Sequence, residues 1–196
     1  MLKNFHKHLS EILDVPEENI QKCAIHYDIR FFKKGSMLVQ EGEASADRFF
    51  VETGLLRMFS IDKNGKEHVI QFAPEGWIIS DSTSQLLNEK SRFYVEAIED
   101  SEIVVLSDDF FFNLGEIYPQ VAEKNQRLML NHIKNLQNRV NALISTTAEE
   151  RYMEFLKKYP NIMLRVPQWM VASYLGITPE SLSRVRKELA KKNFEV

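Results

Sequence analysis

Residues 166–189 read VPQWMVASYLGITPESLSRVRKEL, and this stretch predicts two short helices joined by a tight turn. Met170 and Tyr174 follow helical spacing in the first half of the stretch. Gly176 can take the positive φ at which a helix ends, and Thr178 is well placed to cap the helix that follows. This layout is typical of a helix-turn-helix, whose second helix enters the DNA major groove.

The second helix of this pair has one apolar and one polar face. Its apolar side is predicted from Leu182, Val185 and Leu189. The polar side carries Glu180, Ser181, Ser183, Arg184 and Lys187. Arginine on guanine is the commonest specific base contact, and a carboxylate can accept from the cytosine amino group. A structural interpretation stays open, because many folds contain two short amphipathic helices and an acid in a first helical turn also serves as a cap.

Composition and charge limit the class of protein. The chain has 196 residues, 44% of them hydrophobic, which is enough for one large domain or two small ones. Its net charge is −3, yet residues 149–196 carry +3 and the remainder −6. A basic module on an acidic body is common in regulators that touch DNA with one end.

The single cysteine, Cys23, cannot build an internal disulfide framework, an iron–sulfur cluster or a Cys-based zinc site, and we expect it to be a packing residue. A signal-peptide core and a long apolar run are both absent, so we expect a cytoplasmic protein without a membrane partner.

Short β-type runs separated by turn residues follow an N-terminal helical region that ends near residue 28. The predicted strands are 29–32, 37–40, 48–53, 55–61, 67–73, 77–79, 93–97 and 102–106. The pair Asn64-Gly65 is a strong hairpin signal. Eight short strands at this spacing favour a closed antiparallel barrel or double-sheet roll, which gives an α+β fold once the flanking helices are counted.

A short helix over residues 108–118 precedes a long segment, residues 120–145, that has neither glycine nor proline. Its apolar residues follow the 4-3-4-3 spacing of a coiled-coil seam: Met129, Ile133, Leu136, Val140 and Leu143. We expect this helix to pair two copies of the chain, although a helix packed on its own barrel has a similar pattern. Thr147 and Glu150 fit a capping box that opens a further helix over residues 148–159.

This order of elements resembles the cyclic-AMP receptor and fumarate–nitrate-reductase regulator (CRP/FNR) family over nearly the whole chain. Residues 34–43, KGSMLVQEGE, look like the strand and turn that open the family's roll, and residues 180–184, ESLSR, look like its Glu-x-x-Ser-Arg reading head. Gly54, Gly65 and Gly76 fall at the family's later turn glycines.

The resemblance implies a jelly-roll-like sensor domain with its N-terminal helices (1–118), a dimerisation helix (119–145) and a helix-turn-helix domain (146–196). It further implies that Glu180, Ser183 and Arg184 read a palindromic operator in double-stranded DNA, and that Thr178 holds a phosphate. RNA polymerase is an implied partner.

The effector site departs from the family pattern at four positions: Asp81, Ser82, Ser91 and Arg92. Cyclic-nucleotide binders hold the ribose with a glutamate and the phosphate with an arginine, but here Asp81 and Ser91 align with those residues. A buried phosphate without a cation is costly, so the usual binding of cyclic AMP is not expected and the small-molecule effector is unknown. Arg92 is expected to face the other side of its strand.

Other family features are missing as well. The iron–sulfur cysteines are absent, and the scattered histidines, which we expect on the surface, predict no heme or metal site: His6, His8, His26, His68 and His132. The family's two-stranded wing is reduced to a few residues, so DNA affinity should depend more on Lys191 and Lys192.

Two other functions compete with DNA binding. A metal-dependent barrel enzyme needs clustered histidines, and His68 alone lies in a predicted strand, so we expect no enzyme and no cofactor. A ligand- or protein-binding roll without DNA-binding activity stays open, and salt-dependent DNA binding would distinguish it from a regulator.

Overall fold

The computed structural model describes residues 2–22, 27–44, 47–81, 84 and 89–194. They form two compact units, of which the first comprises residues 1–61 and 70–129 and the second comprises residues 62–69 and 130–196. Cys23, His26 and Ser82 lie outside the described residues. The predicted domain boundaries near residues 118 and 145 stay a prediction.

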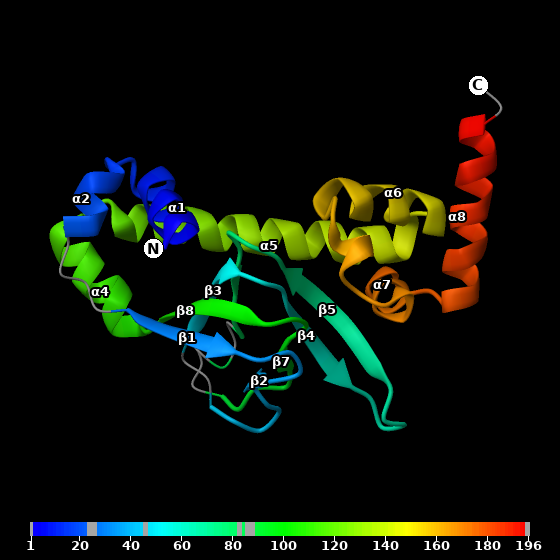
Figure 1. Cartoon of the computed structure of the whole chain (residues 1–196), viewed down its shortest axis with the longest axis horizontal. Helices are drawn as coiled ribbons and strands as arrows, with labels where there is room; N and C mark the ends of the chain where they lie inside the picture. The colour runs from blue at the N-terminus through cyan, green and yellow to red at the C-terminus, as the bar shows by residue number, and fades with distance from the viewer. Residues whose placement is uncertain (1, 23–26, 45–46, 82–83, 85–88, 195–196) are drawn as a thin grey trace. The chain divides into compact units, whose positions relative to one another are not determined.

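Eight strands occur in the described parts of the chain (Figure 1). They are β1 (Asp28–Phe32), β2 (Met37–Val39), β3 (Arg48–Thr53), β4 (Leu56–Ile61), β5 (Glu67–Ala73), β6 (Ile78–Ile79), β7 (Tyr94–Ala97) and β8 (Ser101–Leu106). They form two four-stranded antiparallel sheets, in the orders β1-β8-β3-β6 and β2-β7-β4-β5. Each predicted strand is confirmed with its ends shifted by one residue at most, and the α+β double-sheet prediction is confirmed.

The core of the first unit has two layers that share β3. Phe49 and Val51 point between the sheets and pack with Leu56 and Val95 of the opposite sheet. Phe50 points the other way, into a second cluster formed with the helices. Successive side chains of a strand face opposite sides, so a strand covered on both sides reads as a continuous apolar run.

The helices of this second layer are α1 (Lys3–Leu13), α2 (Glu17–Lys22) and α4 (Asp108–Ile117). Helix α1 has no side-chain cap of its own. Instead the buried carboxylate of Glu52 in β3 accepts hydrogen bonds from the backbone N–H of Asn4 (2.9 Å) and of Phe5 (2.8 Å). A carboxylate at this end of a helix satisfies free donors and complements the helix dipole, so β3 holds α1 in place.

Two of the histidines correct the expectation of a surface position. The Nε2 atom of His6 lies 3.1 Å from the Tyr27 hydroxyl, and His8 packs its ring 5.0 Å from that of Phe50. Burial lowers the pKa of His8, against a smaller opposing effect of Glu11. Both side chains are half-buried, and the neighbouring Phe5 and Leu9 of helix α1 belong to the core cluster that includes Phe50 of β3.

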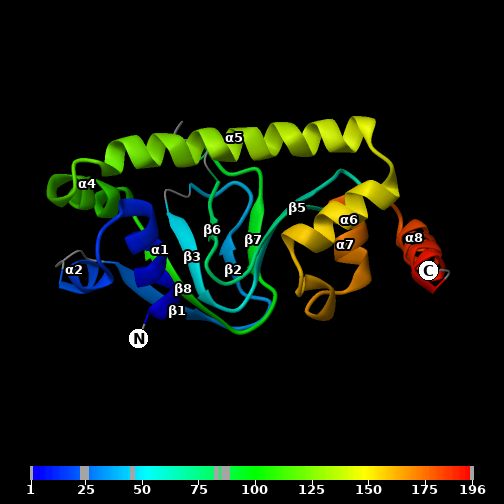
Figure 2. The same cartoon turned by 90° about the horizontal axis from the view of Figure 1, so that it is seen from above.

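The remaining helices follow in the order that the sequence predicts. They are α5 (Val121–Ser145), α6 (Ala148–Lys158), the short 3₁₀ helix η1 (Ile162–Leu164), α7 (Gln168–Leu175) and α8 (Pro179–Phe194). Figure 2 shows α5 as one uninterrupted helix. The capping box is confirmed, since Thr147 accepts from the Glu150 backbone N–H and Glu150 accepts from that of Thr147.

In the chain as described, no helix has both the length and the apolar character needed to cross a membrane. The same residues nowhere gather three or more His, Cys, Asp or Glu side chains in an arrangement that could hold a metal ion.

Candidate nucleic-acid interface

Helices α7 and α8 form the helix-turn-helix. Gly176 ends α7 with φ of 69° and donates its N–H to the carbonyls of Ala172 and Ser173. The Thr178 hydroxyl accepts from the Ser181 backbone N–H at 3.2 Å, which makes Thr178 the cap of α8 as predicted. The buried side chains are Met170, Val171, Ala172, Tyr174 and Leu175 of α7 with Leu182 and Val185 of α8.

The polar face of α8 is exposed. A helix turns by about 100° per residue, which places Glu180, Arg184, Lys187 and Lys191 within about 60° of one another. All four are exposed, as is Ser183 at the edge of the same face. Ser181 differs, because it is half-buried and its hydroxyl lies 3.3 Å from that of Thr178. This face of the helix therefore presents three cationic side chains, one arginine and two lysines, together with one acid.

Glu180 is held at the start of its own helix. Hydrogen bonds from its own backbone N–H and from the Thr178 hydroxyl lower the pKa of Glu180. The carboxylate therefore stays ionised at neutral pH, and in this structure it acts as a cap. It is also fully exposed, so it can turn toward a donor such as a cytosine amino group.

The two lysines near the end of α8 differ in their surroundings. Lys192 places its Nζ atom 2.7 and 2.9 Å from the carboxylate oxygens of Glu149 in α6. This hydrogen-bonded pairing raises the pKa of Lys192. Lys191 points away from the buried side of α8 and is exposed. Of the two, Lys191 is the better placed to contact a phosphate.

Sequence reasoning missed Arg151 of α6. Its Nε atom donates to the Leu175 carbonyl at 3.0 Å, and its Nη1 atom donates to the Thr146 carbonyl. One guanidinium thus satisfies free carbonyls at the ends of α5 and α7. The sequence holds no signal for this role, since any arginine near a helix end could have played it.

Two residues of the predicted effector site are hydrogen-bonded to each other. Ser91 is buried and donates its hydroxyl to the carboxylate of Asp81 at 2.7 Å. The backbone N–H of Ser84 reaches the other Asp81 oxygen at 3.4 Å. Arg92 is exposed as predicted, but it lies in a bend before β7 and not in a strand, so alternation along a strand is not the reason. The neutral Ser91 hydroxyl therefore stands at the position that aligns with the phosphate-binding arginine, and it is hydrogen-bonded to the carboxylate that aligns with the ribose-binding glutamate.

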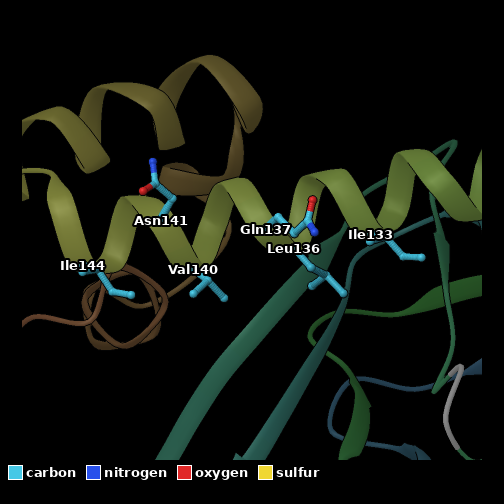
Figure 3. A pocket seen from close by; sticks show the side chains of 6 residues that line it. All are labelled: Ile133, Leu136, Gln137, Val140, Asn141 and Ile144. Atoms are coloured by element: carbon cyan, nitrogen blue, oxygen red, sulfur yellow. The ribbon is translucent and has the colours of Figure 1, made fainter.

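Helix α5 carries an exposed apolar stripe. Ile133, Leu136, Val140 and Ile144 line up on one side of it, beside Gln137 and Asn141 (Figure 3). They line a groove of about 440 Å³.

Met129 and Leu143 of the predicted seam are exposed as well, at 42% and 43%. The Cδ2 atom of Leu143 lies 3.0 Å from the point where a Cβ of Gly176 would stand. Ile144, at 81% exposed, joins the stripe although the predicted seam did not include it. In a straight α-helix, residues seven positions apart are offset by about 20° around the axis. Residues eleven positions apart, such as Ile133 and Ile144, therefore lie on nearly the same side of the helix.

Comparison with known proteins agrees with this architecture. The model of the cyclic nucleotide-binding domain matches residues 29–118. The chain is 24% identical over 170 residues to the anaerobic regulatory protein of Pasteurella multocida, which covers 81% of this chain and 62% of that protein. It is 26% identical over 167 residues to the transcriptional activator FnrA of Stutzerimonas stutzeri, covering 80% and 68%. The chain thus spans less than two thirds of the length of the Pasteurella relative.

Solved structures show the same fold. FixK2 from Bradyrhizobium japonicum superposes with a TM-score of 0.74 at 21% identity, covering 86% of each chain. A CooA mutant from Carboxydothermus hydrogenoformans superposes with a TM-score of 0.68 at 20% identity, covering 94% of this chain and 84% of that one. The two named relatives are regulators, so sequence similarity places the chain beside regulators and not beside enzymes.

Proposed function

Because the chain carries the fold and the cyclic nucleotide-binding domain of the CRP/FNR family, we propose that it is a dimeric, sequence-specific DNA-binding transcription regulator of the cytoplasm. The observation that carries the proposal is the exposed face of α8, where Glu180, Ser183 and Arg184 stand free of the packed side of the helix. The relatedness to regulators supports it.

Each side chain of this face has a role that fits its chemistry. Arg184 donates two hydrogen bonds to a guanine, and Glu180 accepts from a cytosine amino group. Ser183 makes a shorter and less discriminating contact. Thr178, at the start of α8, and Lys187 and Lys191 bind phosphates, which fix the register of the helix but carry no sequence information.

The apolar stripe of α5 supports the dimer. Four large apolar side chains in a row are exposed in one copy of the chain, and a second copy would cover them. Two copies related by a two-fold axis present two recognition helices, so the operator is a palindrome whose half-sites are about one helical turn apart.

The roll responds to an effector other than cyclic AMP. The support is the buried Ser91 hydroxyl, which is neutral, is hydrogen-bonded to Asp81 and aligns with the arginine that holds the phosphate in cyclic-nucleotide binders. Calorimetry with cyclic AMP should give no binding at micromolar concentration, and micromolar affinity would contradict this assignment. RNA polymerase is the partner through which the bound dimer would act on transcription.

DNA binding can be tested without knowing the operator. Labelled fragments from upstream of the protein's own gene are titrated with the protein, and anisotropy is measured at several salt concentrations with and without cell extract. A regulator should bind one fragment more tightly than the others, and every affinity should fall steeply with salt.

One observation favours a second candidate, a ligand- or protein-binding roll whose helix-turn-helix does not bind DNA. The Glu180 carboxylate is satisfied by its own helix and by Thr178, so the structure of α8 does not require DNA to explain it. A dimer without salt-dependent DNA binding in the same titrations would support this candidate and exclude the regulator.

A further inference from the structure

A pocket of about 310 Å³ lies within the second unit, between α5, α6 and α7. Part of its wall is apolar and comes from Leu143 of α5, Phe155 of α6, and Tyr174 and Leu175 of α7. Phe155, Tyr174 and Leu175 are buried, so helix packing fixes most of this surface. Small-molecule pockets usually have about 300–1,000 Å³, apolar and aromatic walls, and a few polar groups that converge. The pocket is therefore large enough for a ligand about the size of one ring.

Two guanidinium groups converge on this pocket. Arg139 of α5 and Arg151 of α6 both line it. Arg139 donates from Nη2 to the Tyr174 carbonyl at 2.9 Å, and Arg151 donates from Nε to the Leu175 carbonyl at 3.0 Å. Because these two carbonyls belong to successive residues, the two guanidinium groups lie at the same end of α7.

Both groups keep hydrogen-bond donors that face no acceptor of the protein. The Nη2 atom of Arg139 also donates to the Val69 carbonyl at 3.3 Å, and the guanidinium stacks 3.7 Å from the centre of the Tyr174 ring. These contacts fix its plane, whereas its Nε and Nη1 atoms donate to none of the described residues. The same holds for Nη2 of Arg151, whose other two nitrogens bind the helix ends. Two planar donor groups are thus held in place before any ligand arrives.

The charge of the two arginines is not balanced by an acid of the protein. Both side chains are half-buried, and within the described parts of the chain neither forms an ion pair. The other charged residues that line the pocket are Glu154 and Lys158, which are both exposed. Burial, and after it the charge of Lys158, lowers the pKa of the nearby His132. The carbonyls at the end of α7 offset only part of the cost of burying two cations, so the pocket favours an anion.

We propose that this pocket binds a small organic anion, namely a carboxylate that carries an apolar ring or chain. The carboxylate lies between the unused donors of Arg139 and Arg151, and the apolar body lies against Phe155 and Leu143. A guanidinium pairs with a carboxylate through two parallel hydrogen bonds, which are stronger in a partly desolvated pocket than in water. The inference goes beyond the proposed function, because this binding needs only α5, α6 and α7 and no DNA.

Benzoate is the probe for this site. The full chain is titrated with benzoate while two-dimensional amide NMR spectra are recorded, and the Leu143, Phe155 and Leu175 amides should shift saturably at millimolar benzoate. Benzyl alcohol has a similar ring without the charge, and inorganic phosphate has the charge without the ring. Both should bind about tenfold more weakly than benzoate.

These titrations can overturn the proposal in two ways. If the pocket amides do not shift with benzoate, or shift equally with benzyl alcohol, the pocket is not an anion site. If phosphate binds more tightly than benzoate, the apolar wall plays no part and the ligand class is wrong.

Substitutions locate the binding site. Arg139→Gln should weaken benzoate binding about tenfold, as expected for the loss of a charge-assisted hydrogen bond. Lys158→Gln, at an exposed position on the pocket wall, should weaken it by a smaller factor. The matched control is Lys157→Gln, an exposed lysine of the same helix that does not line the pocket, and it should bind benzoate as the parent protein does.

Parental affinity in a folded Arg139→Gln variant would overturn the role of the guanidinium, and far-UV circular dichroism checks the fold. If that variant does not fold, equal affinities of Lys158→Gln and Lys157→Gln would overturn the site instead. The outcomes are also separate from those for DNA binding. A protein that binds benzoate here but no DNA would contradict the proposed function alone, and one that binds its operator without benzoate shifts would contradict this inference alone.

Discussion

A charge in the apolar stripe of α5 should break the proposed dimer. Leu136 is 43% exposed in one copy of the chain. Burying a whole leucine side chain is worth about 1.5–3 kcal/mol, so covering this fraction is worth about 1 kcal/mol per protomer and about 2 kcal/mol per dimer. The Leu136→Ala variant should therefore weaken dimerisation by about 30-fold.

The Leu136→Glu variant should have a larger effect. It would bring two carboxylates close together across the two-fold axis, without partners and partly desolvated. An unpaired buried charge costs about 3–5 kcal/mol, so this variant should be monomeric at micromolar concentration. Sedimentation equilibrium measures both variants, and far-UV circular dichroism checks that α5 still forms.

The matched control is Lys134→Glu. This exposed position lies two residues from Leu136, which places it about 200° around the helix, away from the stripe. The control should remain a dimer. A Leu136→Glu variant that stays dimeric at micromolar concentration would refute the assignment of this stripe to the interface.

Three further predictions concern the recognition helix and helix α1. Glu180→Ala should weaken operator binding while binding to scrambled DNA holds or rises, because a charge that repels phosphate is removed; an equal loss on both DNAs would leave Glu180 as a capping residue only. Lys191→Gln should lower the slope of log DNA affinity against log salt concentration by about one. Lys192→Gln should lower this slope less, because Lys192 is paired with Glu149. A larger effect of Lys192→Gln than of Lys191→Gln would contradict the structure. The unfolding free energy should fall as the pH drops below 6.5, because burial lowers the pKa of His8 and the unfolded chain then binds more protons than the folded one. Chemical denaturation at several pH values should show a smaller fall in a His8→Phe variant. Equal pH profiles of the two proteins would argue against this.

Local patterns predicted most of the fold. The strands follow from alternation and turn residues, and the ends of α7 and α8 follow from Gly176 and Thr178, whose partners lie within a few residues in the chain. The exchange of the effector-site arginine for Ser91 came from the resemblance to the family and stays a prediction, although the structure places Ser91 against Asp81. The predictions of strands and helix ends need only the geometry of one element or of two neighbouring strands.

Contacts between distant residues could not be predicted in this way. The bonds from Val69 to Ser173 and to Arg139 span 104 and 70 residues, and nothing in either neighbourhood marks them. The place of Ile144 in the stripe of α5 was not predicted, for another reason. Whether a stripe follows seven or eleven residues depends on whether the helix is supercoiled, and two heptads of sequence do not determine that.

The contact between Glu52 and α1 bears on the order of events during synthesis. Helix α1 leaves the ribosome before β3, because the carboxylate that caps it is made 47 residues after Phe5. An isolated helix of 11 residues is marginal in water, so the newly made segment has little reason to stay helical until β3 has formed. The first helix in the chain is therefore among the later elements to become stable, and its apolar side, with Phe5 and Leu9, stays open to chaperones until then.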